Sequence, residues 1–261
     1  MHDCGVPALK EPELDEILAF CAEDPVERVF LEDIARRGLG RFTALARNGH
    51  LTALCHAGAN LVPSGEGCGA FAELADDWRA RMIIGEQGAV TELWDAASPR
   101  LPPPREDRPG QPVYVLDEAP EPGETGLRAA TPDDFDLLLP ACAAAHREEI
   151  GIDPLDRDPE GFRWRTRAQI DEGRSWLWAE GGTILFKAEA SAWTPVQCSC
   201  NRSGSTRRYE GTVMRSGGCA TSAACYSPAY RPSACSSGAT MQSRSGSTRR
   251  SGCGTRSRIG A

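Results

Sequence analysis

Charged side chains that could hold an ammonium or move a proton stand at two places in the second half of the chain. The run His146–Glu149 (HREE) ends a predicted helix, and Lys187 and Glu189 stand two residues apart on a predicted strand, so they share one face. A carboxylate in such a position can orient an ammonium or take its proton. Each place also has a plainer interpretation: charge runs are usually solvated, and Lys187 and Glu189 can pair with each other.

The elements that must position these residues follow the order strand, helix, helix, strand, strand. Thr131 is a predicted N-cap with Pro132 at the first helical position, and Gly151 ends that helix, which Pro140 is expected to kink or split. Gly181-Gly182 is a two-residue hairpin signal. The expected bounds are a strand at Leu127–Thr131, a helix from Thr131 to Gly151, a helix at Pro159–Glu172, and strands at Ser175–Ala179 and Thr183–Trp193.

Two stretches within these elements carry a family resemblance. They are DLLLPACAAAHREEIGIDPL (Asp136–Leu155) and ILFKAEASAWTP (Ile184–Pro195). With the order of the elements, they resemble the first half of the GNAT superfamily of N-acetyltransferases, and most closely its actinobacterial members that have an extra N-terminal domain. The resemblance implies an α/β fold with a mixed sheet, made of tandem GNAT-like halves.

The same resemblance implies a function and a set of site residues. Members transfer an acetyl group from acetyl-CoA to an amine, and backbone amides at a helix N-terminus hold the pyrophosphate. By this likeness Glu148, Glu149 and Glu189 are expected to bind the substrate, which would be a small-molecule or peptide amine. No catalytic residue, residue that binds the cofactor, or metal ligand is assigned.

The first half of the chain, residues 1–118, repeats the pattern in a weaker form. Helical stripes cover Glu11–Arg37 with a break at Asp24-Pro25, and Asn48-Gly49 is a hairpin signal between Phe42–Arg47 and Leu51–Leu61. The glycine signature expected next is replaced by NLVPSGEGCGAF (Asn60–Phe71), which indicates a degenerate GNAT-like domain without strong cofactor binding. The remaining expected elements are a helix with Phe71, Leu74, Ala75 and Trp78 on one face, a strand at Met82–Ile84, a helix with Val90, Leu93, Trp94 and Ala97 on one face, a proline- and charge-rich connector at Arg100–Pro112, a closing strand at Pro112–Glu118, and a linker at Ala119–Thr125.

After Trp193 the composition changes abruptly. The tail, residues 194–261, has 68 residues with no Leu, Phe, Trp, Lys or Asp, and it sets ten Arg against the single Glu210. Six of the 11 cysteines are here. Such a segment lacks the apolar surface to offset chain entropy and is predicted to be disordered by itself. The second GNAT-like half, residues 126–193, would then be incomplete, without its fourth strand or its acetyl-CoA loop.

Three interpretations of the tail compete: a basic disordered segment that binds nucleic acid, a cysteine-rich metal or disulfide module, and an out-of-frame translation of a GC-rich gene. The third is favoured. In the frame that starts at each codon's third base, Cys198–Arg215 can encode an alternating strand followed by R-G-N-G, and Gly246–Cys253 can encode L-Y-E-T-V-G-M. Both resemble GNAT motifs. We therefore expect this chain to bind acetyl-CoA poorly; the alternative function is a non-enzymatic binding module whose tail binds nucleic acid.

Composition bounds the remaining possibilities. Residues 1–193 carry 36 acidic and 19 basic side chains, which argues against nucleic-acid binding by the folded part. No apolar run is long enough to span a bilayer and no signal-peptide pattern is present, so we expect a cytoplasmic protein. The cysteines before the tail lack metal-ligand spacing and are predicted to be buried, reduced thiols: Cys4, Cys21, Cys55, Cys68 and Cys142.

Overall fold

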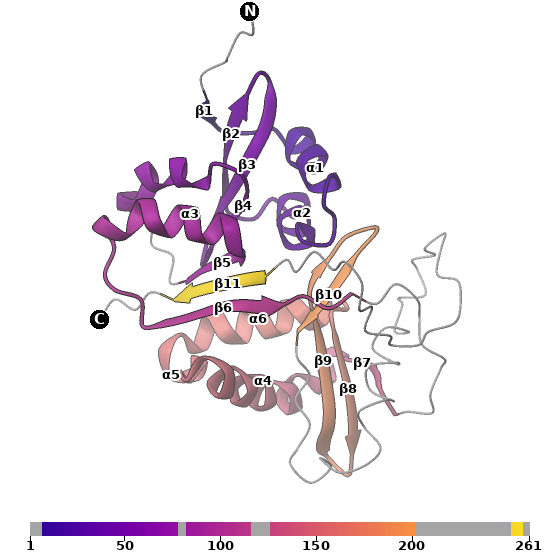
Figure 1. Ribbon diagram of the computed structural model, residues 1–261. Helices are drawn as coiled ribbons and strands as arrows, with labels where there is room; N and C mark the ends of the chain where they lie inside the picture. Colours follow the sequence, from indigo (N-terminus) through magenta and orange to yellow (C-terminus); the bar gives the residue numbers. More distant parts are fainter. Residues whose placement is uncertain (1–6, 78–81, 116–125, 202–251, 258–261) are drawn as a thin grey trace, which may run out of the picture. The chain divides into compact units, whose positions relative to one another are not determined.

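The computed structural model describes residues 7–77, 82–115, 126–201 and 252–257. The chain divides into two units, shown in Figure 1. The first contains the described residues of 1–115, 192–197 and 243–261, and the second those of 116–191 and 198–242. Each unit combines a sheet with packed helices, so the predicted mixed α/β class is confirmed. The expected linker Ala119–Thr125 lies outside the described residues.

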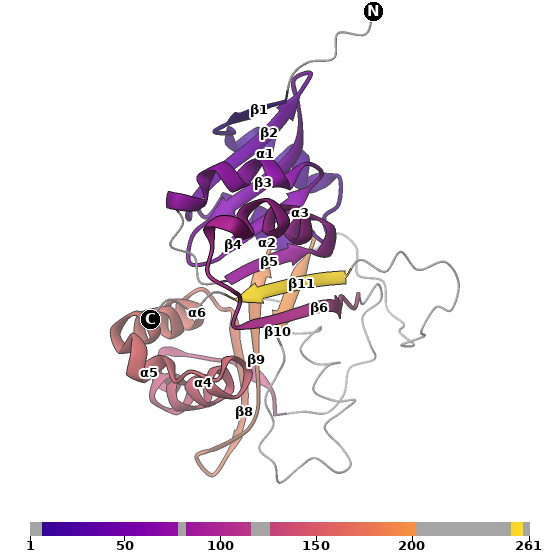
Figure 2. The ribbon, with the colours of Figure 1, turned by 60° about the vertical axis from the view of Figure 1, so that its left-hand side comes forward.

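The first unit is built on a seven-stranded sheet with the order β1-β2-β3-β4-β5-β11-β6. Its pairs are antiparallel except β4–β5, which is parallel and aligns Leu61 with Ile83. Figure 2 shows the sheet from a second side. The strands are β1 (Ala8–Lys10), β2 (Arg41–Arg47), β3 (His50–Ala57), β4 (Leu61–Gly65), β5 (Met82–Glu86), β6 (Glu106–Pro112) and β11 (Gly252–Ser257).

The predicted hairpin at Asn48-Gly49 is confirmed. Asn48 has a φ of 52° and Gly49 a φ of 79°, the two positive values that a type I′ turn requires between β2 and β3. The second arm is shorter than expected, because β3 ends at Ala57 and Leu61 begins a separate strand, β4. The single strand predicted at Leu51–Leu61 therefore corresponds to β3 and the first residue of β4. The prediction merged them because both strands are apolar and only Gly58–Asn60 separates them.

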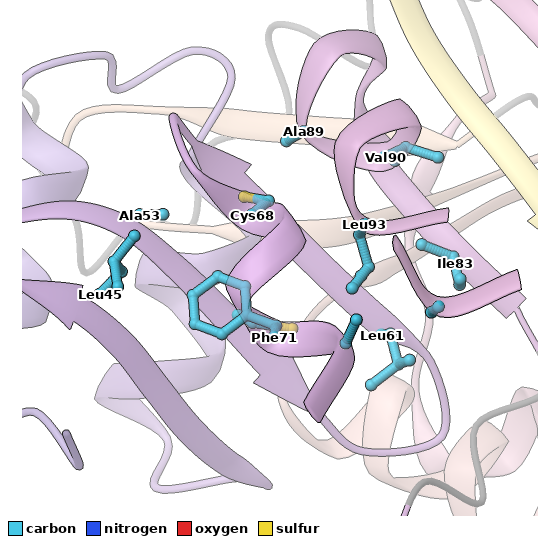
Figure 3. Close-up of a cluster of buried hydrophobic side chains, with 12 residues drawn as sticks. Leu45, Ala53, Leu61, Cys68, Phe71, Ile83, Ala89, Val90 and Leu93 are labelled. Atoms are coloured by element: carbon cyan, nitrogen blue, oxygen red, sulfur yellow. The ribbon is translucent and has the colours of Figure 1, made fainter. Parts of the chain in front are cut away.

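Helices cover both faces of this sheet, as Figure 1 shows. One face packs α1 (Leu14–Ala22) and α2 (Val29–Arg36) against Ala44 and Leu54, and the break expected near Asp24-Pro25 lies between these two helices. The neighbouring positions Leu45 and Ala53 point to the other face, as strand alternation requires. There they join a cluster under α3 (Gln87–Ala97) and the 3₁₀ helix η1 (Cys68–Asp77), and Figure 3 shows its side chains filling one layer, with Phe71, Leu93 and Leu61 in its centre.

Two expectations for this unit are wrong in detail. The segment after β4 forms a 3₁₀ helix that begins at Cys68, where an amphipathic helix around Phe71 was expected. The closing strand is Glu106–Pro112, inside the expected connector, while Val113–Val115 has no strand structure. Prolines are tolerated in β6 because it is the edge of the sheet, and Gly110, with a φ of 70°, lies where the register with β11 shifts.

The second unit has a four-stranded sheet with the order β10-β9-β8-β7. Its helices pack on Leu177 and Ile184 of that sheet through Phe135, Leu138 and Phe162. The elements are β7 (Arg128–Ala129), η3 (Pro132–Asp134), α4 (Phe135–Ile150), α5 (Pro154–Arg157), α6 (Pro159–Asp171), β8 (Ser175–Glu180), β9 (Thr183–Trp193) and β10 (Cys198–Asn201). The order predicted from the sequence is confirmed, and α5 and β10 are additions to it.

The ends of α4 follow the sequence signals. Thr131 and Asp134 form a capping box around the 3₁₀ turn η3, which leads directly into α4, and Gly151 ends α4 with a φ of 75°. Arg128 donates two hydrogen bonds of 2.7 Å to the Asp134 carboxylate and ties β7 to this turn. Pro140 does not split the helix; the backbone bond that it removes belongs to Asp136, an exposed position where water can reach the carbonyl.

Two pieces of the tail belong to sheets. After Trp193, the Thr194 amide donates to the Gln197 carbonyl across a tight turn, and Cys198–Asn201 pairs with β9 as a fourth strand. The expectation that this sheet stops at its third strand is therefore wrong. β11 lies between β5 and β6 in the first unit. Both strands pair with strands that lie outside the tail. This fits a segment with too little apolar surface to fold by itself. Within the described residues, no helix is long and apolar enough to cross a membrane.

Candidate functional site

Polar groups gather at the carboxyl ends of β4 and β5 in the first unit. Ser64 donates a hydrogen bond to the Glu86 carboxylate and accepts one of 3.1 Å from Nε of Arg28. Arg28 also donates to the Phe20 carbonyl and lies over the Phe20 ring, with its central carbon 3.7 Å from the ring centroid. This network joins the segment before α2 to the end of the parallel pair, the kind of edge at which α/β sheets bind ligands.

An anion-binding backbone arrangement follows Ser64 directly. The amides of Gly67 and Cys68 both donate to Oε2 of Glu92 on α3, at 2.8 Å each. We call these two amides the amide cradle. Gly65 and Gly67 have φ values of 91° and 89°, which turn successive N–H groups toward one side and which residues with a side chain rarely adopt. The cradle lies in the stretch Asn60–Phe71, where the sequence predicted a degenerate loop for binding the cofactor, and its occupant is a carboxylate of the chain itself.

A second cluster lies between α4 and β9 in the second unit. Nζ of Lys187 is 3.1 Å from Oε2 of Glu189, and the Cys142 thiol donates to Oε1 of the same carboxylate at 3.0 Å. Lys187 is buried, and the Glu189 side chain keeps 26% of its surface exposed. Lys187 and Glu189 thus pair with each other, which was one of the two interpretations left open by their spacing.

Electrostatics in this cluster favour an ammonium, a carboxylate and a neutral thiol. Burial opposes the charge of Lys187, but Glu189 and Cys142 outweigh it, so the pKa of Lys187 is raised. Burial, with the neighbouring Glu189 charge, raises the pKa of Cys142 to about 12. A thiol with that pKa is a poor nucleophile at neutral pH. The cluster is therefore suited to hold charge in place and unsuited to thiol chemistry.

The other predicted substrate-binding residues lie elsewhere on α4. Glu148 and Glu149 are exposed in its last turn, six and seven residues beyond Cys142, or roughly 9–10 Å along the helix axis. His146 packs on the Phe162 ring at 6.0 Å, and burial lowers its pKa. The helix therefore holds Glu148 and Glu149 apart from Glu189, and the role of all three in substrate binding stays a prediction.

The cysteines that the structure describes before the tail are reduced thiols. Cys21, Cys55, Cys68 and Cys142 are buried free thiols, as predicted, and Cys4 lies outside the described residues. Among the residues that the structure describes, no group of three or more His, Cys, Asp or Glu could hold a metal.

Sequence reasoning did not identify four polar residues of the first unit. They are Arg28, Ser64, Glu86 and Glu92. The glycines at 65, 67 and 69 were the available signal for the cradle, but they mark a turn without naming the anion. Glu92 comes from a helix 25 residues away, so only the packing of α3 shows that it reaches the loop.

The comparisons with known proteins give one family match and low structural likeness. The family model described as "Domain of unknown function (DUF4081)" matches residues 40–138. No curated protein matches the sequence. Solved structures with similar folds include a GNAT-family acetyltransferase from Colwellia psychrerythraea (TM-score 0.41, 8% identity, 78% of this chain and 80% of that chain) and a GCN5-related N-acetyltransferase from Sphaerobacter thermophilus (TM-score 0.42, 16% identity, 78% of each chain). We base the functional proposal on the chain's own strand order and contacts.

Proposed function

We propose that this chain has the scaffold of an acetyl-CoA-dependent N-acetyltransferase and that its donor site is closed by its own carboxylate. The reaction forms a bond between the amine nitrogen and the acetyl carbonyl carbon and breaks the thioester bond, and the proton that the amine loses ends on the released CoA thiol. The proposal rests on the element order of both units and on the position of the amide cradle. The acceptor would be a small-molecule or peptide amine.

The amide cradle is the observation that carries this proposal. A glycine-rich turn follows β4, which pairs in parallel with β5, and its amides converge on a carboxylate at the start of the 3₁₀ helix η1. A diphosphate needs the same arrangement, because backbone N–H groups and a helix N-terminus both favour negative charge. In this chain Glu92 already accepts both hydrogen bonds, so a diphosphate must displace a carboxylate before it can bind.

The cost of this displacement sets the expected impairment. Hydrogen bonds to a charged group contribute about 1.5–3 kcal/mol each when shielded, and less at an exposed position such as Glu92. A net cost of about 1.4 kcal/mol weakens donor binding about tenfold. The wild-type chain is therefore expected to bind acetyl-CoA poorly, in agreement with the expectation from the sequence.

For the second unit considered by itself, we propose that Glu189 binds the ammonium of an amine substrate, and that Glu148 and Glu149 are separate contacts for such a substrate at the end of α4. Glu189 is the partly exposed carboxylate of the second unit's cluster, and Lys187 fixes its position through their ion pair. A fixed carboxylate can hold an ammonium and receive its proton as the amine attacks.

A thiol-release assay with acetyl-CoA and a panel of primary amines tests the function. Opening the cradle with Glu92→Ala is expected to raise amine-dependent release of CoA thiol about tenfold over wild type, because the donor no longer competes with a carboxylate. Glu73→Ala is the control, since it removes the same charge from η1 away from the cradle. Equal rates for all three proteins, with or without amine, would overturn the proposal.

A further inference from the structure

A buried histidine in the first unit has no role in the proposed reaction. His56 on β3 has 5% of its surface exposed and lies across from Phe42 of β2 in the strand register. Its ring centroid is 5.1 Å from that of Phe42 and 6.4 Å from that of Phe30 in α2. The ring therefore occupies an apolar box between α2 and the sheet.

Neither ring nitrogen of His56 has a hydrogen-bond partner among the described residues. The backbone of Leu39 is the polar group that acts on the ring, and it raises the pKa of His56 less than burial lowers it. A buried polar group without a partner costs about 1–3 kcal/mol, which is unusual enough to need a physical reason. An apolar side chain of similar size would avoid this cost.

Two glycines form the wall that the ring edge touches. A Cβ atom on Gly40 would overlap Nε2 of His56, and one on Gly58 would lie 2.7 Å from Cε1. Gly40 belongs to the loop between α2 and β2 and has a φ of 73°. The backbone at Gly40 and Gly58 therefore covers the edge of the His56 ring. A water molecule or a polar side chain can reach the ring nitrogens there only if the loop at Gly40 moves. We call residues 37–41 together with 58–60 the histidine corner.

Charged groups do not offset this burial. The influences on the pKa of His56 are burial, which lowers it, and the Leu39 carbonyl, which raises it. The two carboxylates of α2 are already paired, Glu32 with Arg36 at 2.8 Å and Asp33 with Arg37 at 3.8 Å. The titratable and charged side chains on the elements packed around the ring are Glu32, Asp33, Arg36 and Arg37 of α2 and its end, Arg41 and Arg47 of β2, and His50 and Cys55 of β3.

We propose that His56 is a pH-sensitive latch that holds the histidine corner closed when its ring is neutral and releases it when the ring is protonated. A proton on the ring places a cation in an apolar box with no counter-charge. The cation can find water only if the loop at Gly40 moves away, so protonation is coupled to opening of the corner. This inference does not depend on the proposed acetyl transfer.

The size of the effect follows from linkage. In the open corner the ring has the ordinary histidine pKa near 6.5, and in the closed corner its pKa is lower. Stability of the closed state is therefore complete above about pH 6.5 and is lost as the pH falls through and below that value. If the closed ring stays neutral, the population of the open corner rises about tenfold between neutral pH and pH 5.5.

Hydrogen exchange followed by mass spectrometry tests the latch. Protection of the peptides that cover residues 36–44 and 56–61, corrected for the intrinsic pH dependence of exchange, is expected to fall about tenfold from pH 7.5 to 5.5. His56→Leu, which has a similar volume and cannot titrate, is expected to show no such fall. His146→Leu is the matched control, because it removes the histidine of the second unit whose pKa is also lowered and should leave the corner's pH dependence intact.

The outcomes separate the latch from a structural histidine. Equal pH dependence in wild type and His56→Leu would overturn the proposal. If His56→Leu does not fold, the NMR titration of the wild-type ring decides instead. A His56 ring that titrates below pH 6.5, together with a loss of protection on the acidic side of that value, supports the latch, whereas a ring that titrates at or above 6.5 refutes it.

Discussion

The Lys187–Glu189 pair offers a quantitative test of what holds the second unit together. Glu189→Met leaves the Lys187 ammonium buried without its carboxylate, since the side chain of Lys187 is only 6% exposed. Removing one partner of a buried pair costs about 3–5 kcal/mol. Glu189 keeps 26% of its side chain exposed, so water screens part of this interaction and we expect about 2–3 kcal/mol.

The double variant Lys187→Met/Glu189→Met separates the pair from the packing. Both charges are then gone, and two methionines of similar length fill the space under α4. Because a buried ion pair is often no more stable than its apolar replacement, the double variant is expected within about 1 kcal/mol of wild type. The coupling energy from the cycle should therefore be about 1–3 kcal/mol.

Urea unfolding followed by the tryptophan fluorescence of β8 is a suitable assay, because Trp176 lies in the same sheet. Glu148→Met is the control, an exposed carboxylate at the end of α4 whose loss should change stability by less than about 0.5 kcal/mol. A free energy of unfolding for Glu189→Met that equals both wild type and the double variant would refute the pairing.

The free energies of unfolding of wild type and of Glu189→Met are expected to change in opposite directions as the pH rises toward about 10. In wild type the pKa of Lys187 is raised, so its contribution to stability is present at neutral pH and is lost as the pH rises above about 10. In Glu189→Met burial, the largest influence on Lys187, loses its main counterweight, so the pKa of Lys187 falls below about 10.4 and stability should rise as the pH approaches that value. A decline in both proteins over this range would contradict the assignment.

Three further predictions follow from local contacts and from the tail. In thermal unfolding, Gly40→Ala should destabilise the chain by about 2–4 kcal/mol and Gly38→Ala by about 1 kcal/mol. Both glycines have a positive φ, but only a Cβ at Gly40 would meet the His56 ring, so equal effects of the two substitutions would contradict this packing. Arg128 keeps the pKa of Asp134 well below its usual range, so Asp134→Asn should cost about 1–2 kcal/mol at pH 7, and this cost should shrink progressively as the pH falls below about 4, because wild type then loses the same stability. The nucleotide sequence from codon 185 onward should spell R-G-N-G and Y-E-x-V-G-M in the third-base frame; codons that forbid both motifs would instead favour a genuine tail that binds nucleic acid.

The local signals in the sequence predicted most helices and hairpins because each depends on a few adjacent residues. Thr131 starts the turn η3, which leads into α4, with a capping box, and Gly151 ends α4 with a left-handed cap, as their residue types favour. Asn48-Gly49 and Gly181-Gly182 connect their strands with positive φ values. These features need no partner from a distant segment, so residue type and spacing suffice to predict them.

The features that the sequence did not predict depend on distant partners. β11 pairs with β5 and β6 from a position 140 residues or more further along the chain, and its glycine-rich sequence shows no strand periodicity. The contact of Glu92 with the amide cradle and the burial of His56 likewise depend on how α3 and α2 pack. Spacing put Lys187 and Glu189 on one face, but only the fold brings Cys142 of α4 to the same carboxylate.

A calorimetric titration with acetyl-CoA tests the central claim, a donor cradle closed by Glu92, most directly. The wild-type chain is expected to show no binding at micromolar concentrations, and Glu92→Ala should bind about tenfold more tightly, with inorganic pyrophosphate competing for the same site. Micromolar binding by wild type, or equally weak binding by wild type and Glu92→Ala, would contradict the account.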